Sequence, residues 1–178
     1  MQILLHVLLA IFTSTSDADA EGLHRFDPNE VTVDQARDHV WAARVAATYY
    51  NVDVDMVLAI GWHESRFTDS VVAVEPGGRV SCGAMTPYPT RTCKKKTLLE
   101  QYFDGTKHWA VDWRRAGDVR NEREVLLGYA GGYHLIRACR QGPVLRHETE
   151  GDDLCKTPEV FMGIRNRIRA ARMPRAAS

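Results

Sequence analysis

Neither sign of charge predominates in this sequence. Its 23 lysine and arginine residues are balanced by 23 aspartate and glutamate residues. A domain that binds nucleic acid normally carries a clear surplus of positive charge, because it must neutralise phosphates. The composition therefore argues against nucleic acid as a partner.

A hydrophobic run long enough to cross a membrane is also missing. The apolar stretch at residues 1–12 falls short of the roughly 20 residues that a spanning helix needs. Ala18-Asp19-Ala20 follows it and matches the A-x-A cleavage pattern of secretory signal peptides, although no lysine or arginine precedes the apolar stretch. We interpret residues 1–20 as a signal peptide and residues 21–178 as one exported domain, periplasmic or secreted. An uncleaved amino-terminal anchor is the alternative.

Metal-binding spacings are absent as well. The sequence contains no C-x-x-C pair and no H-x₃-H pair, so we expect no metal site and no other cofactor. The cysteines are Cys82, Cys93, Cys139 and Cys155, and an even number in an exported chain indicates disulfides. Of the three possible connectivities, proximity in sequence favours Cys82–Cys93 and Cys139–Cys155.

Several common enzyme classes lack their motifs here. His63-Glu64 is not followed by the second histidine of H-E-x-x-H, and neither a G-x-S-x-G elbow nor a P-loop is present. A cysteine nucleophile is disfavoured because all four cysteines are expected to pair. A mechanism that uses a carboxylate remains.

One carboxylate stands out by its position. Val57, Ile60, Gly61 and Glu64 are spaced at i, i+3, i+4 and i+7, so on a helix they share one face. Partial burial of Glu64 would raise its pKa towards the range of a general acid. The alternative is an ordinary acid at a helix end, exposed to solvent and paired with Arg66.

The periodicity of the remaining chain predicts a mainly α fold. Long loops and a few short strands should connect the helices. We expect an extended lead-in at residues 21–31 and a helix at 33–50 behind a capping box of Thr32 and Gln35. A second helix follows at 54–66 with Asp53 as its N-cap.

Further helices are predicted downstream. A short helix near Leu98 should end at the Asp104-Gly105 turn, and a long helical segment should cover residues 120–140. Its glycine-rich centre requires either a close approach by another group or a helix break. A last helix should begin with Thr157 as its N-cap. One of its faces carries four arginines, and such a basic face is usually solvated.

Three segments, in order, resemble the motifs of a known family. They are Glu64-Ser65-Arg66-Phe67, Cys82-Gly83-Ala84-Met85-Thr86-Pro87 and Gly128-Tyr129-Ala130-Gly131-Gly132. They are similar to the E-S-x-F, G-L-M-Q and A-Y-N-x-G motifs of the lytic transglycosylases with a soluble-transglycosylase (SLT), goose-type-lysozyme-like domain. The resemblance covers roughly residues 33–140.

The resemblance implies a single lysozyme-like catalytic domain that acts on peptidoglycan glycan strands. Glu64 would be the general acid and base, with Tyr129 and Ser65 in support. The positions carried over for substrate binding are Ala84, Met85, Thr86 and Gly131. Such enzymes cut between N-acetylmuramic acid and N-acetylglucosamine and release 1,6-anhydro-muropeptides. Small members, which we expect to be monomeric, serve secretion, conjugation or phage machinery.

The sequence departs from the family at three positions. Ala130, Thr86 and Ala84 replace asparagine, glutamine and leucine, and the first two replacements remove amide donors for sugar groups. A non-catalytic peptidoglycan-binding module is therefore an alternative. Hydrolysis of the lysozyme type is another, if Asp69 or Glu75 supplies a second acid to activate water.

Overall fold

The computed structural model describes residues 16–28, 31–68, 70, 72–75, 78–85, 94–113, 119–145 and 153–173. Within these ranges the chain is mainly α, as predicted. The described elements are α2 (Ser16–Phe26), α3 (Val33–Tyr50), α4 (Val54–Ser65), β1 (Val72–Glu75), β2 (Arg79–Cys82), α5 (Leu98–Lys107), the π-helix η1 (His108–Trp113), α6 (Glu122–Cys139), the 3₁₀ turn η2 (Leu154–Lys156) and α7 (Thr157–Arg172).

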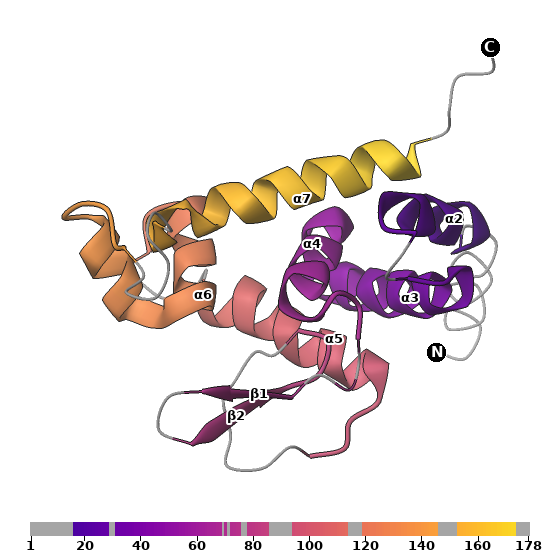
Figure 1. Cartoon of the computed structure of the whole chain (residues 1–178), viewed down its shortest axis with the longest axis horizontal. Coiled ribbons are helices and arrows are strands. Elements are labelled where there is room, and N and C mark those ends of the chain that lie inside the picture. Colours follow the sequence, from indigo (N-terminus) through magenta and orange to yellow (C-terminus); the bar gives the residue numbers. More distant parts are fainter. Residues whose placement is uncertain are drawn as a thin grey trace.

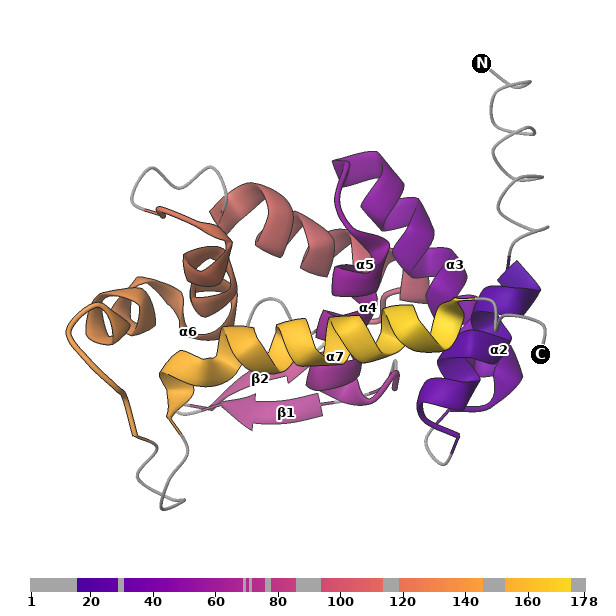
Figure 2. The ribbon, with the colours of Figure 1, turned by 90° about the horizontal axis from the view of Figure 1, so that it is seen from above.

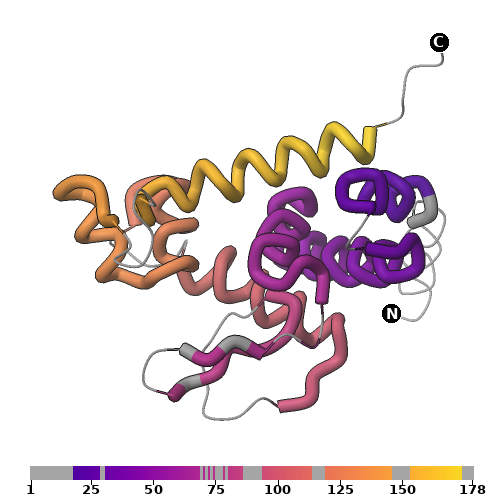
Figure 3. Tube along the Cα trace, viewed as in Figure 1, coloured from indigo at the N-terminus to yellow at the C-terminus, as the bar shows by residue number. Residues whose placement is uncertain are grey.

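The helices are arranged around α4, with α7 lying along one side of the molecule (Figure 1). α7 contacts α6 near its start, then α4, and finally α2. Seen from above, α6 lies at one end of α7 and the α2–α3 pair at the other (Figure 2). β1 and β2 form an antiparallel hairpin that pairs Val72 with Cys82 and follows directly on α4 (Figure 3).

One hydrophobic core contains side chains from every described α-helix. Its largest fully buried members include Trp109, Tyr102 and Phe161. No helix in the described part of the chain is both long and apolar enough to cross a membrane.

The predicted starts of α3 and α4 are confirmed. Gln35 donates its backbone N–H to Thr32 Oγ1 at 3.2 Å, and its side-chain oxygen accepts from the backbone of Thr32 at 3.0 Å. Asp53 caps α4 by accepting from the backbone N–H of Asp55 at 3.0 Å. These caps satisfy amides that would otherwise lack partners at a helix start.

The expected extended lead-in is wrong, because most of it is helical. α2 covers Ser16–Phe26 and buries Ala20 and Leu23 completely. Asp19 forms ion pairs with Arg44 of α3 and Arg172 of α7. α2 thus includes both sides of the predicted cleavage point after Ala20, and contacts with two other helices stabilise it.

The expected end of α5 at Asp104-Gly105 is also wrong. α5 continues to Lys107 and passes directly into η1. A Cβ on Gly105 would overlap the side chain of Met85. This glycine therefore permits a close approach of the chain after β2 and does not end the helix.

Both interpretations of the glycine-rich segment in α6 are correct, at different residues. A Cβ on Gly128 would overlap the indole of Trp113, so this glycine admits a neighbouring ring. Gly132 has φ 70° and ψ −170°, which kinks α6. A left-handed φ of this kind is readily adopted only by glycine.

The start of α7 differs by one residue from the prediction. Thr157 is the first helical residue and Lys156 precedes it as the cap. Within the described chain no side chain caps α7, whereas Asp153 caps the preceding turn η2 by accepting from the backbone N–H of Cys155 at 3.0 Å. Cys139–Cys155 is a disulfide with Cα atoms 5.5 Å apart, so this predicted pairing is confirmed.

The arginines of α7 are not simply a solvated face. Arg169 donates to Asp55 at 2.8 Å and to Asp53 at 2.6 Å, and Arg172 pairs with Asp55 and Asp19. We call this set the arginine–aspartate network. Its members are Asp19, Asp53, Asp55, Arg44, Arg165, Arg169 and Arg172.

The fourth arginine of that face, Arg167, has aromatic partners. Its guanidinium lies 5.3 Å from the centre of the Phe26 ring and 5.8 Å from that of Trp62. Arg167 therefore packs between α2 and α4 through cation–π contacts. The basic residues of α7 dock this helix onto the rest of the fold.

Candidate functional site

The last turn of α4 holds Glu64. Val57, Ile60 and Gly61 are buried as predicted, but so is every residue of α4 from Asp55 to Gly61, and Glu64 is half-buried. A Cβ on Gly61 would lie 2.8 Å from the hydroxyl of Tyr102, so α5 approaches closely here. Glu64 is thus carried on a helix that is fixed by the core.

Ser65 secures the end of this helix. Its hydroxyl donates to the carbonyl of Gly61 at 2.9 Å and accepts from the backbone N–H of Thr68 at 3.2 Å. Both bonds remain within the last turn of α4 and the residues after it. Ser65 therefore supports Glu64 through the backbone, as a helix-terminal residue would.

The turn after Glu64 is strained, which the sequence did not reveal. Arg66 and Phe67 have φ values of 53° and 60°, a left-handed conformation that disfavours residues with side chains. Arg66 stacks on Trp62 with its guanidinium 3.4 Å from the ring centre. Phe67 is buried against His39, 5.1 Å away. These contacts offset the strain and reverse the chain directly beyond Glu64.

His63 ties the same turn to α7. Its ring centre lies 4.6 Å from that of Phe161. Burial, together with the charge of Arg66, lowers the pKa of His63. A neutral imidazole therefore precedes Glu64 in the chain.

The second motif segment lies against α5. Gly83 has φ 89°, and a Cβ there would lie 2.5 Å from the side-chain oxygen of Gln101. That oxygen accepts from the backbone N–H of Ala84 at 2.6 Å, while the amide nitrogen donates to the carbonyl of Lys96 at 3.1 Å. Gln101 therefore holds the segment in place, a role that the sequence did not suggest.

Ala84 and Met85 are completely buried. Their side chains do not line a substrate cleft, which corrects the expectation for both residues. Met85 instead fills the space left by Gly105, with its sulfur 3.9 Å from the hydroxyl of Thr106. What Met85 contributes to the site is its backbone carbonyl.

Tyr129 of α6 connects all three motif segments. Its hydroxyl donates to the carbonyl oxygen of Met85. Burial raises the pKa of Tyr129, and the charge of Glu64 raises it further. The phenol therefore stays neutral and lies within electrostatic range of the Glu64 carboxylate, with its proton directed to Met85.

The π-helix η1 supplies residues that the sequence did not identify. The His108 ring lies 5.5 Å from Tyr129, and Trp113 donates its Nε1–H to His108 Nε2 at 3.2 Å. Burial lowers the pKa of His108, although Asp112 opposes this shift. π-Helical segments often mark functional sites, but no sequence signal marked this one.

The other predicted residues have different outcomes. Gly131 is exposed on α6, while Thr86, Asp69 and the side chain of Glu75 lie outside the described parts of the chain. Cys82 is disulfide-bonded, and its predicted partner, Cys93, also lies outside them. Among the described residues, no group of three or more His, Cys, Asp or Glu side chains could hold a metal ion.

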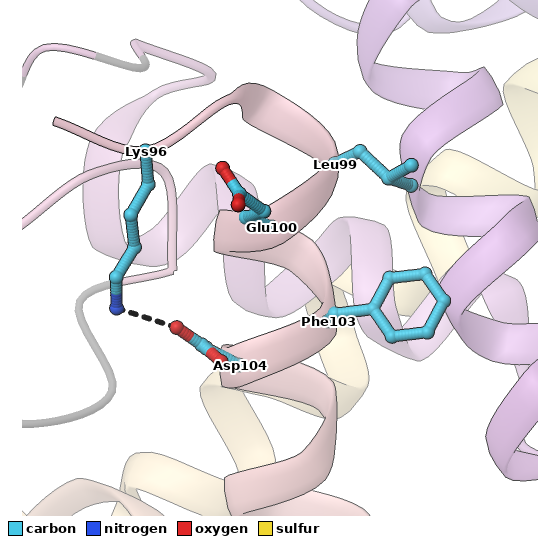
Figure 4. A pocket seen from close by; sticks show the side chains of 5 residues that line it. All are labelled: Lys96, Leu99, Glu100, Phe103 and Asp104. Carbon is cyan, nitrogen blue, oxygen red and sulfur yellow. Dashed lines mark hydrogen bonds and ion pairs between the residues drawn. The ribbon is translucent and has the colours of Figure 1, made fainter.

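A surface pocket of about 340 Å³ lies elsewhere on α5, as Figure 4 shows. Lys96 and Asp104 form an ion pair at 2.5 Å on one side, and Phe103 lies on the side where α3 packs. No predicted site residue lines this pocket.

Tyr129 of α6 links the second motif segment to Glu64, because its hydroxyl donates to the Met85 carbonyl and its pKa responds to the charge of the half-buried Glu64. A half-buried carboxylate held on a core helix can act in proton transfer. Comparison of the chain with known protein families, with curated protein sequences and with solved structures found no match.

Proposed function

We propose that this protein is a lytic transglycosylase that cuts peptidoglycan between N-acetylmuramic acid and N-acetylglucosamine. One observation carries the proposal. The charge of Glu64 raises the pKa of Tyr129, whose hydroxyl donates to the carbonyl of Met85, so Tyr129 relates three segments that are distant in sequence. These are the segments that resemble the family's motifs, and each contributes a group to the site.

Glu64 performs both proton transfers in the proposed reaction. As an acid it protonates the glycosidic oxygen while the bond from this oxygen to C1 of the muramic acid breaks. As a carboxylate it then removes the proton from the 6-hydroxyl of the same sugar, whose oxygen bonds to C1. The products are a 1,6-anhydro sugar and a free 4-hydroxyl, and Glu64 regains its proton. The nucleophile comes from the substrate.

Tyr129 fits this chemistry as a positioning residue. Because its pKa is raised, its hydroxyl remains protonated at neutral pH and adds no second negative charge beside Glu64. Its hydroxyl donates a hydrogen bond to the Met85 carbonyl. The phenol thereby links α6 to the segment after β2 and fixes the wall of the site.

The proposed setting is outside the cytoplasm, where peptidoglycan is exposed. The Cys139–Cys155 disulfide agrees with an oxidising compartment. The enzyme would act there as a monomer on glycan strands, in support of secretion, conjugation or phage machinery.

The decisive experiment compares the full chain with Glu64→Gln on purified peptidoglycan. Mass spectrometry of the released fragments should find anhydro-muropeptides for the unmodified chain, and Glu64→Gln should lower their rate of release by about 100- to 10,000-fold. Circular dichroism and the melting temperature should be unchanged, because Gln preserves the shape of the side chain.

Glu159→Gln is a matched control on α7. Glu159 pairs with Arg123 at 3.0 Å on the surface and should retain full activity. Fragments with reducing ends would replace the proposal with hydrolysis. Binding of peptidoglycan without release of fragments would indicate a non-catalytic module and refute the transglycosylase proposal. Full activity of Glu64→Gln would refute the role of Glu64.

A further inference from the structure

Four rings form a continuous row that leads away from the Glu64 site. Ring-centre distances are 5.5 Å from Tyr129 to His108, 6.0 Å from His108 to Trp113 and 5.0 Å from Trp113 to Tyr133. We call these four residues the aromatic strip. It joins α6 to η1, and it begins beside the charge of Glu64.

The local backbone places these rings on one surface. The wider turn of a π-helix relates residues five apart, which brings His108 and Trp113 together across η1. Gly128 lacks the Cβ that would overlap the indole, so Trp113 can lie directly against α6. The kink at Gly132 then changes the direction of α6 immediately before Tyr133.

Hydrogen bonds fix the orientation of the indole. Trp113 Nε1 can only donate, so His108 Nε2 must be the acceptor and His108 is neutral with its proton on Nδ1. Nδ1 lies 3.5 Å from the carboxylate of Asp112. Burial lowers the pKa of His108 and favours the same neutral state.

Exposure increases along the aromatic strip. Tyr129 is 9% exposed, Trp113 is half-buried and Tyr133 is 39% exposed. The inner end therefore belongs to the core, whereas the outer end offers ring surface to a ligand. A row of this kind suits a chain-like molecule that enters the Glu64 site from outside.

From this geometry we infer that Trp113 and Tyr133 form an outlying subsite for a β-1,4-linked amino-sugar strand, which stacks its rings on their exposed faces. The positive C–H groups of a sugar ring match the negative face of an aromatic ring. The carboxylate of Asp112, 3.5 Å from His108 Nδ1, lies next to the aromatic strip and can accept from sugar hydroxyl or amide groups. The link from this subsite to cleavage rests on the proposed function.

The chain contains a matched control in Tyr49. This residue is 71% exposed and packs against Tyr50 and Phe103, with ring centres 4.9 Å and 5.2 Å away. It is thus an exposed tyrosine supported by other rings, as Tyr133 is. It lies on α3, outside the aromatic strip.

The test measures binding and turnover separately on the full chain. Binding of the soluble β-1,4-linked N-acetylglucosamine tetramer is followed by tryptophan fluorescence and by calorimetry, with Glu64→Gln present in every variant to prevent cleavage. Tyr133→Ala should weaken binding about five- to tenfold, as expected for loss of one stacking ring. Tyr49→Ala should change it less than about twofold, because this ring lies outside the aromatic strip.

Turnover of solubilised peptidoglycan provides the second readout. With Glu64 intact, Tyr133→Ala should raise KM by a similar factor while kcat changes little, since a remote subsite binds ground state and transition state alike. Tyr133→Phe should restore both values, because stacking needs the ring and not the hydroxyl.

The outcomes separate the two proposals. Tetramer binding that depends on Tyr133, without release of fragments from peptidoglycan, keeps the subsite and refutes the catalytic proposal. Anhydro-muropeptide release with an unchanged KM in Tyr133→Ala keeps the catalytic proposal and refutes the subsite. Absence of tetramer binding by the unmodified chain, or equal losses in Tyr133→Ala and Tyr49→Ala, also refutes the subsite.

Discussion

Two polar regions of this protein lie at opposite ends of α4 and differ in their charged groups. In the arginine–aspartate network, three aspartates are shared among four arginines that come from α3 and α7. In the other region, the charge of Glu64 acts on the neutral phenol of Tyr129, and the ring of His108 packs on that phenol.

The two regions differ in the partners of their carboxylates. In the network every aspartate is paired with arginines, and these ion pairs dock α2 and α7 onto the rest of the fold. The charge of Glu64, in contrast, acts on the neutral phenol of Tyr129 and raises its pKa. The comparison predicts that changes in the network alter stability and that changes around Glu64 alter activity.

The largest stability effect should follow from breaking the network at Asp55. This carboxylate is 8% exposed and accepts from both Arg169 and Arg172. Asp55→Ala leaves two arginines without it and should lower the free energy of unfolding by about 3–5 kcal/mol. Denaturant titration measures the loss, and kcat per folded molecule should be unchanged.

Asp34→Ala is the control for an exposed ion pair. Asp34 is 88% exposed and pairs with Arg37 one helical turn away. Its removal should cost less than about 1 kcal/mol. Equal losses for Asp34→Ala and Asp55→Ala would remove the distinction between a docking network and ordinary surface pairs.

Shortening the chain at the predicted cleavage point should have the next largest effect. A protein that begins at residue 21 lacks Asp19 and Ala20, so Arg44 and Arg172 lose a partner and part of the core is exposed. We expect a loss of about 2–3 kcal/mol relative to a protein that begins at residue 16. Thermal unfolding of the two proteins checks this, and equal melting temperatures would show that α2 contributes little through its first turns.

Filling the space at Gly128 should affect the other region. Gly128→Ala places a Cβ where the Trp113 indole lies, and such overpacking costs about 1–3 kcal/mol. Because Trp113 donates to His108, which packs on Tyr129, tetramer affinity and turnover should fall as well.

Gly163→Ala is the matched control in α7. No atom lies within 4 Å of a Cβ at this position. Replacing this helical glycine should stabilise the protein by about 0.5–1 kcal/mol. If both substitutions lowered activity alike, the close contact of Trp113 with α6 would have no special role.

The smallest effect concerns the pH dependence of stability. The pKa of buried His108 lies below 6.5 in the folded protein, so the unfolded chain binds more protons as the pH falls through 6.5. Stability should therefore decrease below that pH, by at most about 1.4 kcal/mol per pH unit for one group. His108→Phe should reduce this slope in denaturant titrations at a series of pH values.

Glu124 titrates in a separate window. Its hydrogen bonds with Arg140 lower its pKa from 4.5 to about 2. The stability it contributes is complete above pH 4.5 and is lost as the pH falls towards 2. Glu124→Gln should remove this lower part of the profile and leave the His108 part in place. If Glu124→Gln and His108→Phe both showed one continuous loss of stability with falling pH, the assignment of two separate pH windows to these residues would be contradicted.

The sequence by itself determined the elements that local chemistry specifies. The capping box of Thr32 and Gln35 begins α3, and Asp53 begins α4, because a side chain three residues or fewer away satisfies free backbone amides. Helical spacing also predicted the partial burial of Glu64, which is half-buried in the last turn of α4. The Cys139–Cys155 pairing followed from proximity in the chain.

Other features were decided only by tertiary contacts. The stretch at Ser16–Phe26 is helical because Leu23 and Asp19 contact α3 and α7, which no local pattern reports. Gly105 did not end α5, because Met85 needs the space beside it. The sequence shows only that a glycine is present. Its structural role depends on which group of the folded protein lies beside it.

The candidate site divides in the same way. Sequence motifs named Glu64, Met85 and Tyr129, but only the fold directs the phenol to the Met85 carbonyl and buries the Met85 side chain. His108 and Trp113 had no recognisable motif, because their roles arise from a π-helical turn packed against a glycine of another helix. Contacts of this kind join residues that are distant in sequence, so only the tertiary structure brings them together.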